Sequence, residues 1–248
     1  MRWSQLLFSQ GFGTRRGCEA LLLGGRVRHA GRGVEDPDEE VAPAEGFEFE
    51  VEGRCWPYHE HALLLLHKPA GYECSQRPGA APSVMTLLPA PLRTRGKGGV
   101  QAVGRLDVDT TGALLLTDDG PLLHRLTSPK HHVPKVYEVM AKHALDDAQL
   151  ARLREGVVLD DDPAPVRAAA VERTGDATLR LTLTEGKYHQ VKRMIAAVGN
   201  RCVGLHRSAI GGLVLDAALA PGQWRWLCPT ERRLVQAPEV GSPASAAR

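Results

Sequence analysis

Apolar residues near the N-terminus follow two different spacings. The first two apolar segments have the spacing of amphipathic helices, with Thr14 placed to cap the second and Gly24 to end it. The next two segments alternate apolar and polar residues, as strands do. These segments are residues 3–10, 15–23, 27–29 and 41–51. Together they predict a small domain over residues 1–55, followed by a linker over residues 56–62.

Longer apolar runs follow residue 62 and predict a second, larger domain. Two continuous runs are typical of buried strands, two alternating segments predict further strands, and two segments fit helices. In that order they are residues 63–66, 113–116, 135–140, 178–183, 146–155 and 188–198. Because strands outnumber helices and no regular strand–helix–strand rhythm repeats, we predict an α+β fold with a mixed, mainly antiparallel sheet and flanking helices. This domain spans residues 63–235 and leaves a flexible tail, residues 236–248, rich in Pro, Ala and Ser.

The charge of the chain is divided unevenly along its length. The 248 residues carry 31 Lys and Arg against 29 Asp and Glu, and the resulting net charge of +2 excludes a uniformly basic nucleic-acid binder such as a histone tail. Residues 1–34 nevertheless hold six arginines and one acid, residues 35–50 hold eight acids and no Lys or Arg, and residues 186–215 hold five cations and no acid. Two basic segments beside ordered motifs favour a polyanion partner, RNA or DNA.

Other sequence features narrow the class of protein. The five cysteines are odd in number and widely spaced, which argues against a disulfide framework and against a zinc site made of thiolates. The longest aliphatic run, residues 62–66, is far shorter than a membrane span, and no cleavable leader is recognisable. We therefore expect a cytoplasmic protein that does not enter a membrane.

An acidic segment bounded by glycines is the strongest candidate for a catalytic site. Residues 104–112 read Gly-Arg-Leu-Asp-Val-Asp-Thr-Thr-Gly and lead into a predicted buried strand. Asp107 is placed to reach into a cleft, whereas Asp109, two residues on, would point away in an extended chain. This favours a single working carboxylate over an acid–base pair. Spacing alone also allows Asp107 to cap the turn that follows it, and favours that interpretation.

Two further segments carry candidate side chains. In the predicted helix from residue 188, His189, Lys192 and Arg193 share a face, so that a cation there could pair with Asp107 and keep it ionised. His189 taken alone fits an ordinary polar helix residue equally well. On the alternating segment 135–139, Tyr137 can be a core residue or can stack on a nucleic-acid base.

The order and length of these motifs resemble the pseudouridine synthases, and within them the branch that includes the bacterial 16S ribosomal RNA enzyme. The resemblance covers residues 63–235, and the first 55 residues resemble the small RNA-binding domain that precedes the catalytic domain in this branch. The motifs that carry it are Gly104-Arg-Leu-Asp107 with Thr110-Thr-Gly112, Thr127-Ser-Pro-Lys130-His-His132 with Lys135-Val-Tyr137, Glu185-Gly-Lys-Tyr-His-Gln-Val-Lys-Arg-Met194, Ala197-Val-Gly-Asn200 and Leu205-His-Arg207.

The resemblance implies a role for each matched residue. Asp107 matches the essential aspartate, Tyr137 the tyrosine that stacks on the target base, Lys192 the cation that pairs with the aspartate, and Arg105 the arginine that helps to displace the target nucleotide. It also implies a reaction without a metal or organic cofactor, and a monomer that acts on ribosomal RNA, 16S rRNA in an assembling small subunit. The residues expected to contact RNA are Arg15, Arg16, Arg26, Arg28, Lys187, His189, Arg193 and Arg207.

Two departures and two alternatives stay open at this stage. His67 stands where relatives usually carry Asn. Residues 89–99, rich in Pro, Gly and Arg, are predicted to form a mobile, basic loop, whose part 93–99 is longer than usual and has no assigned role. The same chemistry on 23S rRNA is one alternative, and a non-catalytic RNA-binding or ribosome-assembly factor is the other. The modified uridine, and whether Asp107 attacks the sugar or the base, are open.

Overall fold

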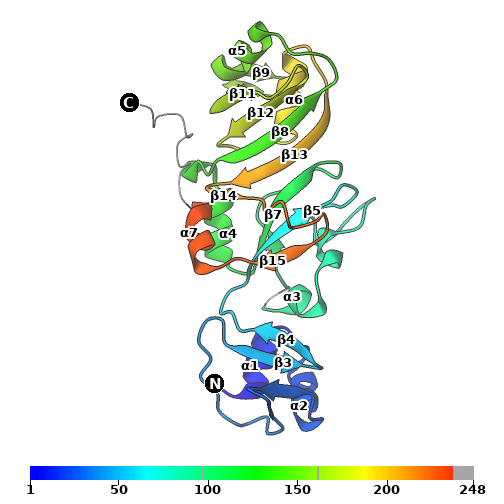
Figure 1. Ribbon diagram of the computed structural model, residues 1–248, viewed down its shortest axis with the longest axis vertical. Helices are drawn as coiled ribbons and strands as arrows, with labels where there is room; N and C mark the ends of the chain where they lie inside the picture. The colour runs from blue at the N-terminus through cyan, green and yellow to red at the C-terminus, as the bar shows by residue number, and fades with distance from the viewer. Residues whose placement is uncertain (97, 161, 237–248) are drawn as a thin grey trace.

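The computed structural model describes residues 1–96, 98–160 and 162–236. A small domain, residues 1–57, lies at one end of the molecule, and a larger domain built around one long sheet makes up the rest (Figure 1). The predicted flexible tail lies outside the described residues except for Gln236, which ends the last helix.

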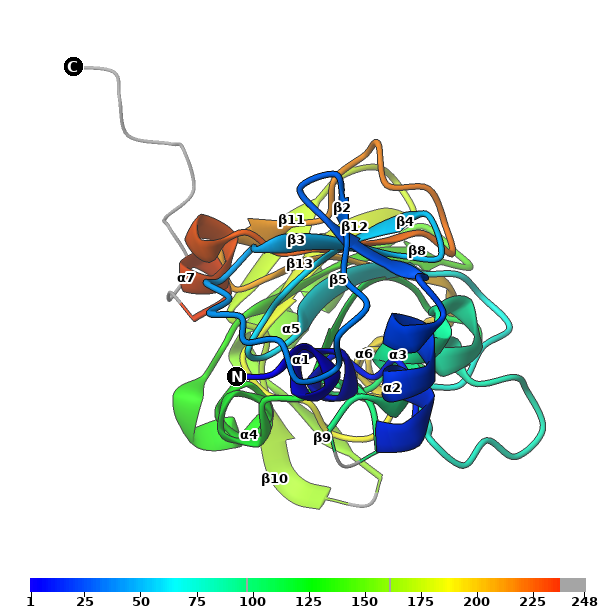
Figure 2. The same cartoon turned by 90° about the horizontal axis from the view of Figure 1, so that it is seen from below.

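The small domain packs two helices on a four-stranded sheet. Figure 2 shows both helices on one side of the sheet, whose strand order is β2-β1-β3-β4. Its elements are α1 (Trp3–Ser9), α2 (Arg15–Leu23), β1 (Val27–His29), β2 (Arg32–Gly33), β3 (Glu48–Val51) and β4 (Arg54–Pro57). The Thr14 hydroxyl accepts a hydrogen bond from Gly17 N and caps α2 as predicted. Residues 56 and 57, predicted to begin the linker, belong to the small domain, because β4 pairs with β3 over residues 54–57 and places Trp56 opposite Phe49.

The larger domain is built on a nine-stranded sheet. Its main path runs β11-β12-β8-β13-β7-β5-β15, with β14 beside β13 and β6 beside β7. All pairs are antiparallel except β13 with β7, which confirms the predicted mixed, mainly antiparallel sheet of an α+β fold. The strands are β5 (Leu63–Lys68), β6 (Gln101–Ala102), β7 (Thr111–Thr117), β8 (Lys135–Ala141), β11 (Ala170–Arg173), β12 (Thr178–Leu183), β13 (Cys202–Ile210), β14 (Leu213–Val214) and β15 (Trp224–Trp226).

Strands β5 and β7 are buried on both faces, which explains their unbroken apolar sequences. Leu64 and Leu66 belong to a core that they share with the small domain, whereas Leu63 and Leu65 belong to a second core on the opposite face. Alternate side chains of a strand point to opposite faces, so a strand covered on both sides needs apolar residues at every position. The position of these strands therefore ties the two domains together.

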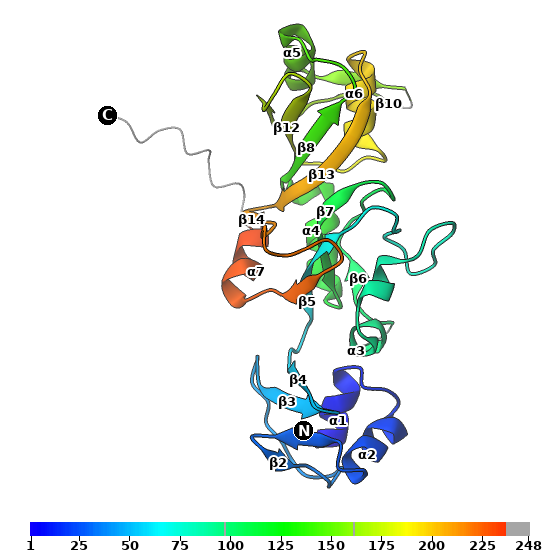
Figure 3. The same ribbon diagram turned by 45° about the vertical axis from the view of Figure 1, so that its right-hand side comes forward.

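Helices cover the sheet in two groups. Helix α4 lines the second core with α7, and Figure 3 shows α5 and α6 at the end of the molecule farthest from the small domain, beside β8, β12 and β13. The remaining elements are α3 (Ala90–Thr94), α4 (Gly120–Thr127), α5 (Asp147–Glu155), α6 (Gln190–Ala197), α7 (Pro229–Gln236), the 3-10 turns Val84–Leu87 and Pro129–His131, and the hairpin of β9 (Val157–Leu159) with β10 (Asp162–Val166). None of the helices in the described ranges is long and apolar enough to cross a membrane.

A buried polar cluster joins the two domains, and it changes the interpretation of residues 93–99. Arg95 was predicted to lie in a mobile loop, but its side chain is 1% exposed. It donates to Asp118 Oδ2 at 2.5 Å, to Gln10 Oε1 at 3.2 Å and to the carbonyl of His59 at 2.8 Å. Gln10 ends α1, so Arg95 links the small domain to the end of β7. The mobile-loop prediction is wrong for Arg95, because a charged group buried among three acceptors is held in place.

Candidate active site

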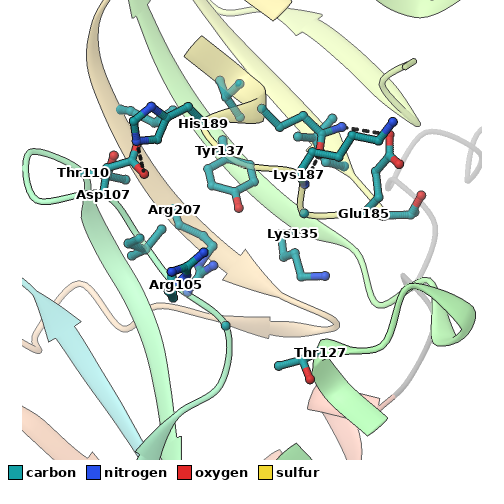
Figure 4. Close-up of a pocket in the computed structure, with 18 of the residues that line it drawn as sticks. Arg105, Asp107, Thr110, Thr127, Lys135, Tyr137, Glu185, Lys187, His189 and Arg207 are labelled. Atoms are coloured by element: carbon teal, nitrogen blue, oxygen red, sulfur yellow. Dashed lines mark hydrogen bonds and ion pairs between the residues drawn. The ribbon is translucent and has the colours of Figure 1, made fainter. Parts of the chain in front are cut away.

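A pocket lies over the central strands of the large sheet, where the predicted motifs meet. Its floor comes from β8 and β13 and its walls from the segment before β7 and the segment before α6 (Figure 4). The residues that line it include Arg105, Asp107, Thr110, Thr127, Lys135, Tyr137, Glu185, Lys187, His189, Leu205 and Arg207. Three motifs that are far apart in sequence therefore face one cavity.

The Asp107 segment is held as a turn by a buried lysine. Thr110 N donates to the carbonyl of Asp107 at 3.1 Å, which closes the turn. At the end of β5, the fully buried Lys68 ammonium donates to the carbonyls of Asp107 at 2.9 Å, Val108 at 3.2 Å and Thr110 at 2.8 Å. Burial lowers the pKa of Lys68, but these carbonyls satisfy its donors. The position of Asp107 thus depends on a neighbouring strand.

Lys192 and His189 flank the Asp107 carboxylate. Oδ2 lies 2.9 Å from Lys192 Nζ, and Oδ1 lies 3.3 Å from His189 Nε2. Lys192 also contacts Asp109 at 2.6 Å, because the segment forms a turn and not the extended chain considered from sequence, and the turn brings both aspartates to the same lysine. Only Asp107 of the two lines the pocket, as predicted. Asp107 lines the pocket with a quarter of its side chain exposed, whereas Asp109 is 73% exposed.

The ion pairs move the pKa values of two of these groups. The hydrogen bond from Lys192 lowers the pKa of Asp109 in spite of partial burial. Burial by itself would lower the pKa of Lys192, but its hydrogen bonds to Asp109 and Asp107 outweigh this and raise it. Lys192 therefore stays protonated beside Asp107 and supplies the counter-charge that an ionised carboxylate needs.

Helix α6 starts later than its sequence pattern indicates. The predicted helix began at residue 188, but α6 begins at Gln190 because His189 adopts a left-handed backbone conformation, with φ of 49°. Non-glycine residues occupy this region rarely. The Tyr188 and His189 rings stack with centroids 3.7 Å apart, and the His189 ring reaches Asp107 from just before the helix.

Strand register places Tyr137 and Arg207 side by side on the pocket floor. Arg207 of β13 pairs directly with Tyr137 of β8, and Lys135 lies two residues before Tyr137 on the same face. On its other side, Arg207 pairs with Gly112 of β7. A Cβ at Gly112 would lie 2.3 Å from the Arg207 carbonyl oxygen, so only glycine allows the Asp107 segment to approach the floor so closely.

The predicted RNA-contacting residues separate into two groups. Lys187, His189 and Arg207 line the pocket, and Arg193 of α6 donates to the Tyr188 carbonyl at 3.1 Å outside it. Arg105, predicted to help displace the target nucleotide, also lines the pocket. The four arginines of the small domain lie away from the pocket, on or next to α2 and β1.

These four small-domain arginines differ in their neighbours. Arg26 pairs with Glu52 at 2.8 Å, and Arg28 donates to the Gly31 carbonyl at 2.6 Å. The Arg15 guanidinium lies over the Phe8 ring, 5.5 Å from its centroid. No ion pair joins Arg15 or Arg16 to an acid in the described part of the chain.

Several pocket residues had no role in the sequence analysis. Lys135 could have been found from strand alternation, because it shares a face with Tyr137. Thr110 is buried beside Asp107, and its hydroxyl has no partner within the described residues. Glu185 accepts from Gln190 Nε2 at 2.9 Å. Lys68 gave no signal beyond its place at the end of an apolar run.

The His67 side chain contacts two neighbouring segments. His67 Nδ1 lies 2.7 Å from the Leu219 carbonyl, and its ring packs edge-on against His206 at 5.5 Å between centroids, so this unusual residue supports the sheet beside the pocket.

Within the described ranges, no three His, Cys, Asp or Glu side chains converge as metal ligands would.

Comparisons with known proteins agree with this arrangement. The family model for RNA pseudouridylate synthase matches residues 62–197. The ribosomal small subunit pseudouridine synthase A of Haemophilus influenzae is 39% identical over 88% of this chain and 92% of its own length, and that of Escherichia coli K12 is 44% identical over 70% and 73%. A crystal structure of pseudouridylate synthase superposes with a TM-score of 0.66 at 34% identity, over 95% of this chain and 99% of that one. This chain therefore belongs to the RNA pseudouridylate synthase family.

Proposed function

We propose that this chain converts a uridine of small-subunit (16S) ribosomal RNA to pseudouridine, with Asp107 as the catalytic carboxylate. The environment of Asp107 carries the proposal. Its carboxylate opens into the pocket, contacts Lys192 at 2.9 Å and His189 at 3.3 Å, and lies at one end of a floor that holds Tyr137. The likeness to enzymes named for the ribosomal small subunit supports the choice of RNA.

The target base has to leave the RNA fold to reach this pocket. Extruding a nucleotide costs a few kcal/mol. Tyr137 offers a ring face to the extruded base, and stacking of this kind contributes about 1–3 kcal/mol. Arg105 is exposed at the pocket wall, where it can hold the displaced strand. The pocket thus offsets part of the cost of extrusion.

Asp107 then acts on the extruded nucleotide as an ionised carboxylate. It serves either as a nucleophile or as a base, and both roles need the charged form. Lys192 provides the counter-charge without reaching into the pocket, because its ammonium is shared between Asp107 and Asp109. A ribosomal RNA substrate supports action in the cytoplasm, and we propose that the enzyme acts as a monomer.

RNA outside the pocket meets the small domain in this proposal. Arg15 and Arg16 open α2, and Arg28 lies on β1. Contacts from such cations to phosphates position the RNA without reading its sequence. Arg193 and Lys187, near the pocket rim, extend the cationic surface toward the catalytic end.

The test is a comparison of uridine modification in cells that lack the gene and carry a chosen variant. We expect the wild-type gene to restore one pseudouridine in 16S rRNA and Asp107→Asn, which keeps the shape of the side chain, to restore none. Asp176→Asn, a change at an exposed aspartate on a distant turn, serves as the matched control and should restore full modification. Full modification by Asp107→Asn would refute the catalytic role. A site that appears in 23S rRNA would reassign the target, and an unchanged pattern without the gene would favour a non-catalytic factor.

A further inference from the structure

Two cations lie inside the pocket without a carboxylate partner among the residues that the structure describes. Arg207 is 2% exposed, and its Nε donates to the Ala113 carbonyl at 2.7 Å. Its Nη2 is buried and has no hydrogen-bond partner among the described residues. The Lys135 ammonium donates to the Val133 carbonyl at 2.9 Å. Buried guanidinium donors are ordinarily satisfied, so an orphaned one that lines a pocket indicates a missing acceptor.

These cations lie around the tyrosine predicted to carry the base. Arg207 is the direct cross-strand neighbour of Tyr137, and Lys135 precedes it by two residues on the same strand. Figure 4 shows both cations on the hydroxyl side of the Tyr137 ring, with Asp107 and His189 toward its other end. A base stacked on Tyr137 with its sugar at Asp107 would therefore direct a ring edge toward Arg207 and Lys135.

The two charges are unfavourable for each other when the pocket is empty. Burial and the nearby Arg207 charge lower the pKa of Lys135 to about 8. Among the described residues neither carboxylate of the pocket forms an ion pair with Lys135: Asp107 pairs with Lys192, and Glu185 accepts from Gln190. Desolvated cations without a counter-charge are costly, and a negative group bound between them would relieve the cost.

The proposed reaction creates such a negative group on the base, and the inference rests on that proposed function. If the N1–C1′ bond breaks, its electron pair stays on the uracil, which becomes a monoanion with charge on its carbonyl oxygens. The sugar is compensated by a bond from Asp107 to C1′ or by loss of a C2′ proton to Asp107. If Asp107 instead adds to C6, the electron pair of the C5–C6 double bond moves onto the C4 carbonyl as an enolate. Each route places negative charge on the base.

We propose that Arg207 and Lys135 bind the carbonyl edge of the target uracil and stabilise the negative charge that the base acquires during the reaction. The charge returns to neutral when C5 bonds to C1′. In that step the Asp107–C1′ bond breaks or Asp107 returns the proton to C2′, and on the addition route Asp107 leaves C6. The C5 proton is then lost as N1 gains one. Fixed donors in a water-poor pocket stabilise developing charge strongly, because they need no reorganisation. A backbone phosphate is the less suitable ligand, because Arg207 lies beside the ring that receives the base.

Single-turnover kinetics on a 16S rRNA fragment test this assignment. We expect Lys135→Met and Arg207→Gln each to slow the chemical step by about 100-fold, the scale for loss of one donor to a developing oxyanion, with unchanged RNA affinity. Lys142→Met is the matched control, because Lys142 follows the same strand and is exposed; it should react at the wild-type rate. Lower RNA affinity at an unchanged rate would assign the pair to a phosphate and overturn the proposal.

A second measurement keeps the test decisive if Arg207→Gln fails to fold. The probe is free 5-nitrouracil, an anion at neutral pH, compared with neutral uracil by equilibrium binding. The wild-type protein should prefer the anion, and Lys135→Met should lose the preference. Equal affinity of the wild-type protein for both bases would overturn the proposal. A wild-type chain that makes no pseudouridine refutes the proposed function, whereas a fully active Lys135→Met refutes only this inference.

Discussion

The titration of the single residue Lys135 makes both the stability and the activity of the protein depend on pH. Burial and the Arg207 charge lower its pKa to about 8, against 10.5 for a free lysine. Below about pH 8 both the folded and the unfolded chain keep the proton. Between about pH 8 and 10.5 the unfolded chain holds a proton that the folded chain has lost, so this group makes stability rise with pH there. Activity should fall with pH over the same range, because the proposed role of Lys135 needs its charged form.

We expect kcat/KM to fall above about pH 8 in the wild-type protein, because this parameter reports the ionisation of the free enzyme. In Lys135→Arg, whose guanidinium stays protonated, the alkaline fall should move to higher pH. The measurement is a pH profile of kcat/KM on one RNA fragment for both proteins. Superimposable alkaline limbs would rule Lys135 out as the titrating group. The charged and titratable groups that face the same pocket are Arg105, Asp107, Tyr137, Glu185, Lys187, His189 and Arg207.

Between elements, the end of β5 controls the turn that carries Asp107. Lys68 donates to four carbonyl groups, including that of Pro69 at 3.0 Å, and it is fully buried. The turn also approaches β13 closely through Gly112, where a side chain would collide with the backbone of Arg207. The catalytic carboxylate is therefore placed by two neighbouring strands and not by its own segment alone.

Lys68→Met should destabilise the protein and abolish turnover. Removing the ammonium leaves several buried carbonyls unsatisfied, at about 1–3 kcal/mol for each, and we expect a loss of about 3 kcal/mol or more. Urea unfolding gives the stability, and single-turnover kinetics under conditions where the variant is folded give the activity. Lys142→Met, an exposed lysine after β8, provides the baseline. A wild-type unfolding midpoint for Lys68→Met would show that the four hydrogen bonds contribute little.

The elements that could be predicted from sequence are those whose pattern is set by burial. Continuous apolar runs identified β5 and β7, and helical spacing with a cap residue identified α2. The start of α6 could not be predicted, because the spacing of side chains does not report the backbone conformation of a single residue, here the left-handed His189. The pairing of Asp107 and Asp109 with one lysine was missed because Lys68, at the end of another strand, holds the turn.

For the molecule as a whole, the acidic segment and the first basic segment neutralise each other in part. Arg2 pairs with Asp38 at 2.9 Å, and Arg32 pairs with Glu39 within the small domain. This leaves Arg15 and Arg16, at the start of α2, without acidic partners in the described ranges. Charge counts along the sequence identified a basic segment, but only the fold decides which of its arginines stay available to RNA.

The orientation of that surface relative to the pocket depends on Arg95. Its guanidinium bridges Asp118, Gln10 and the His59 carbonyl across the two domains, and removing one partner of a buried ion pair costs about 3–5 kcal/mol. We expect Arg95→Met to loosen the small domain, so that hydrogen exchange rises at residues 59–62 and a 16S rRNA fragment binds more weakly. A short RNA that reaches only the pocket should react at an almost unchanged rate, because Asp107 keeps its own supports. Arg93→Met, an exposed arginine in the last turn of α3, is the matched control. Exchange at the control level in Arg95→Met would mean that the apolar contacts alone hold the domains together.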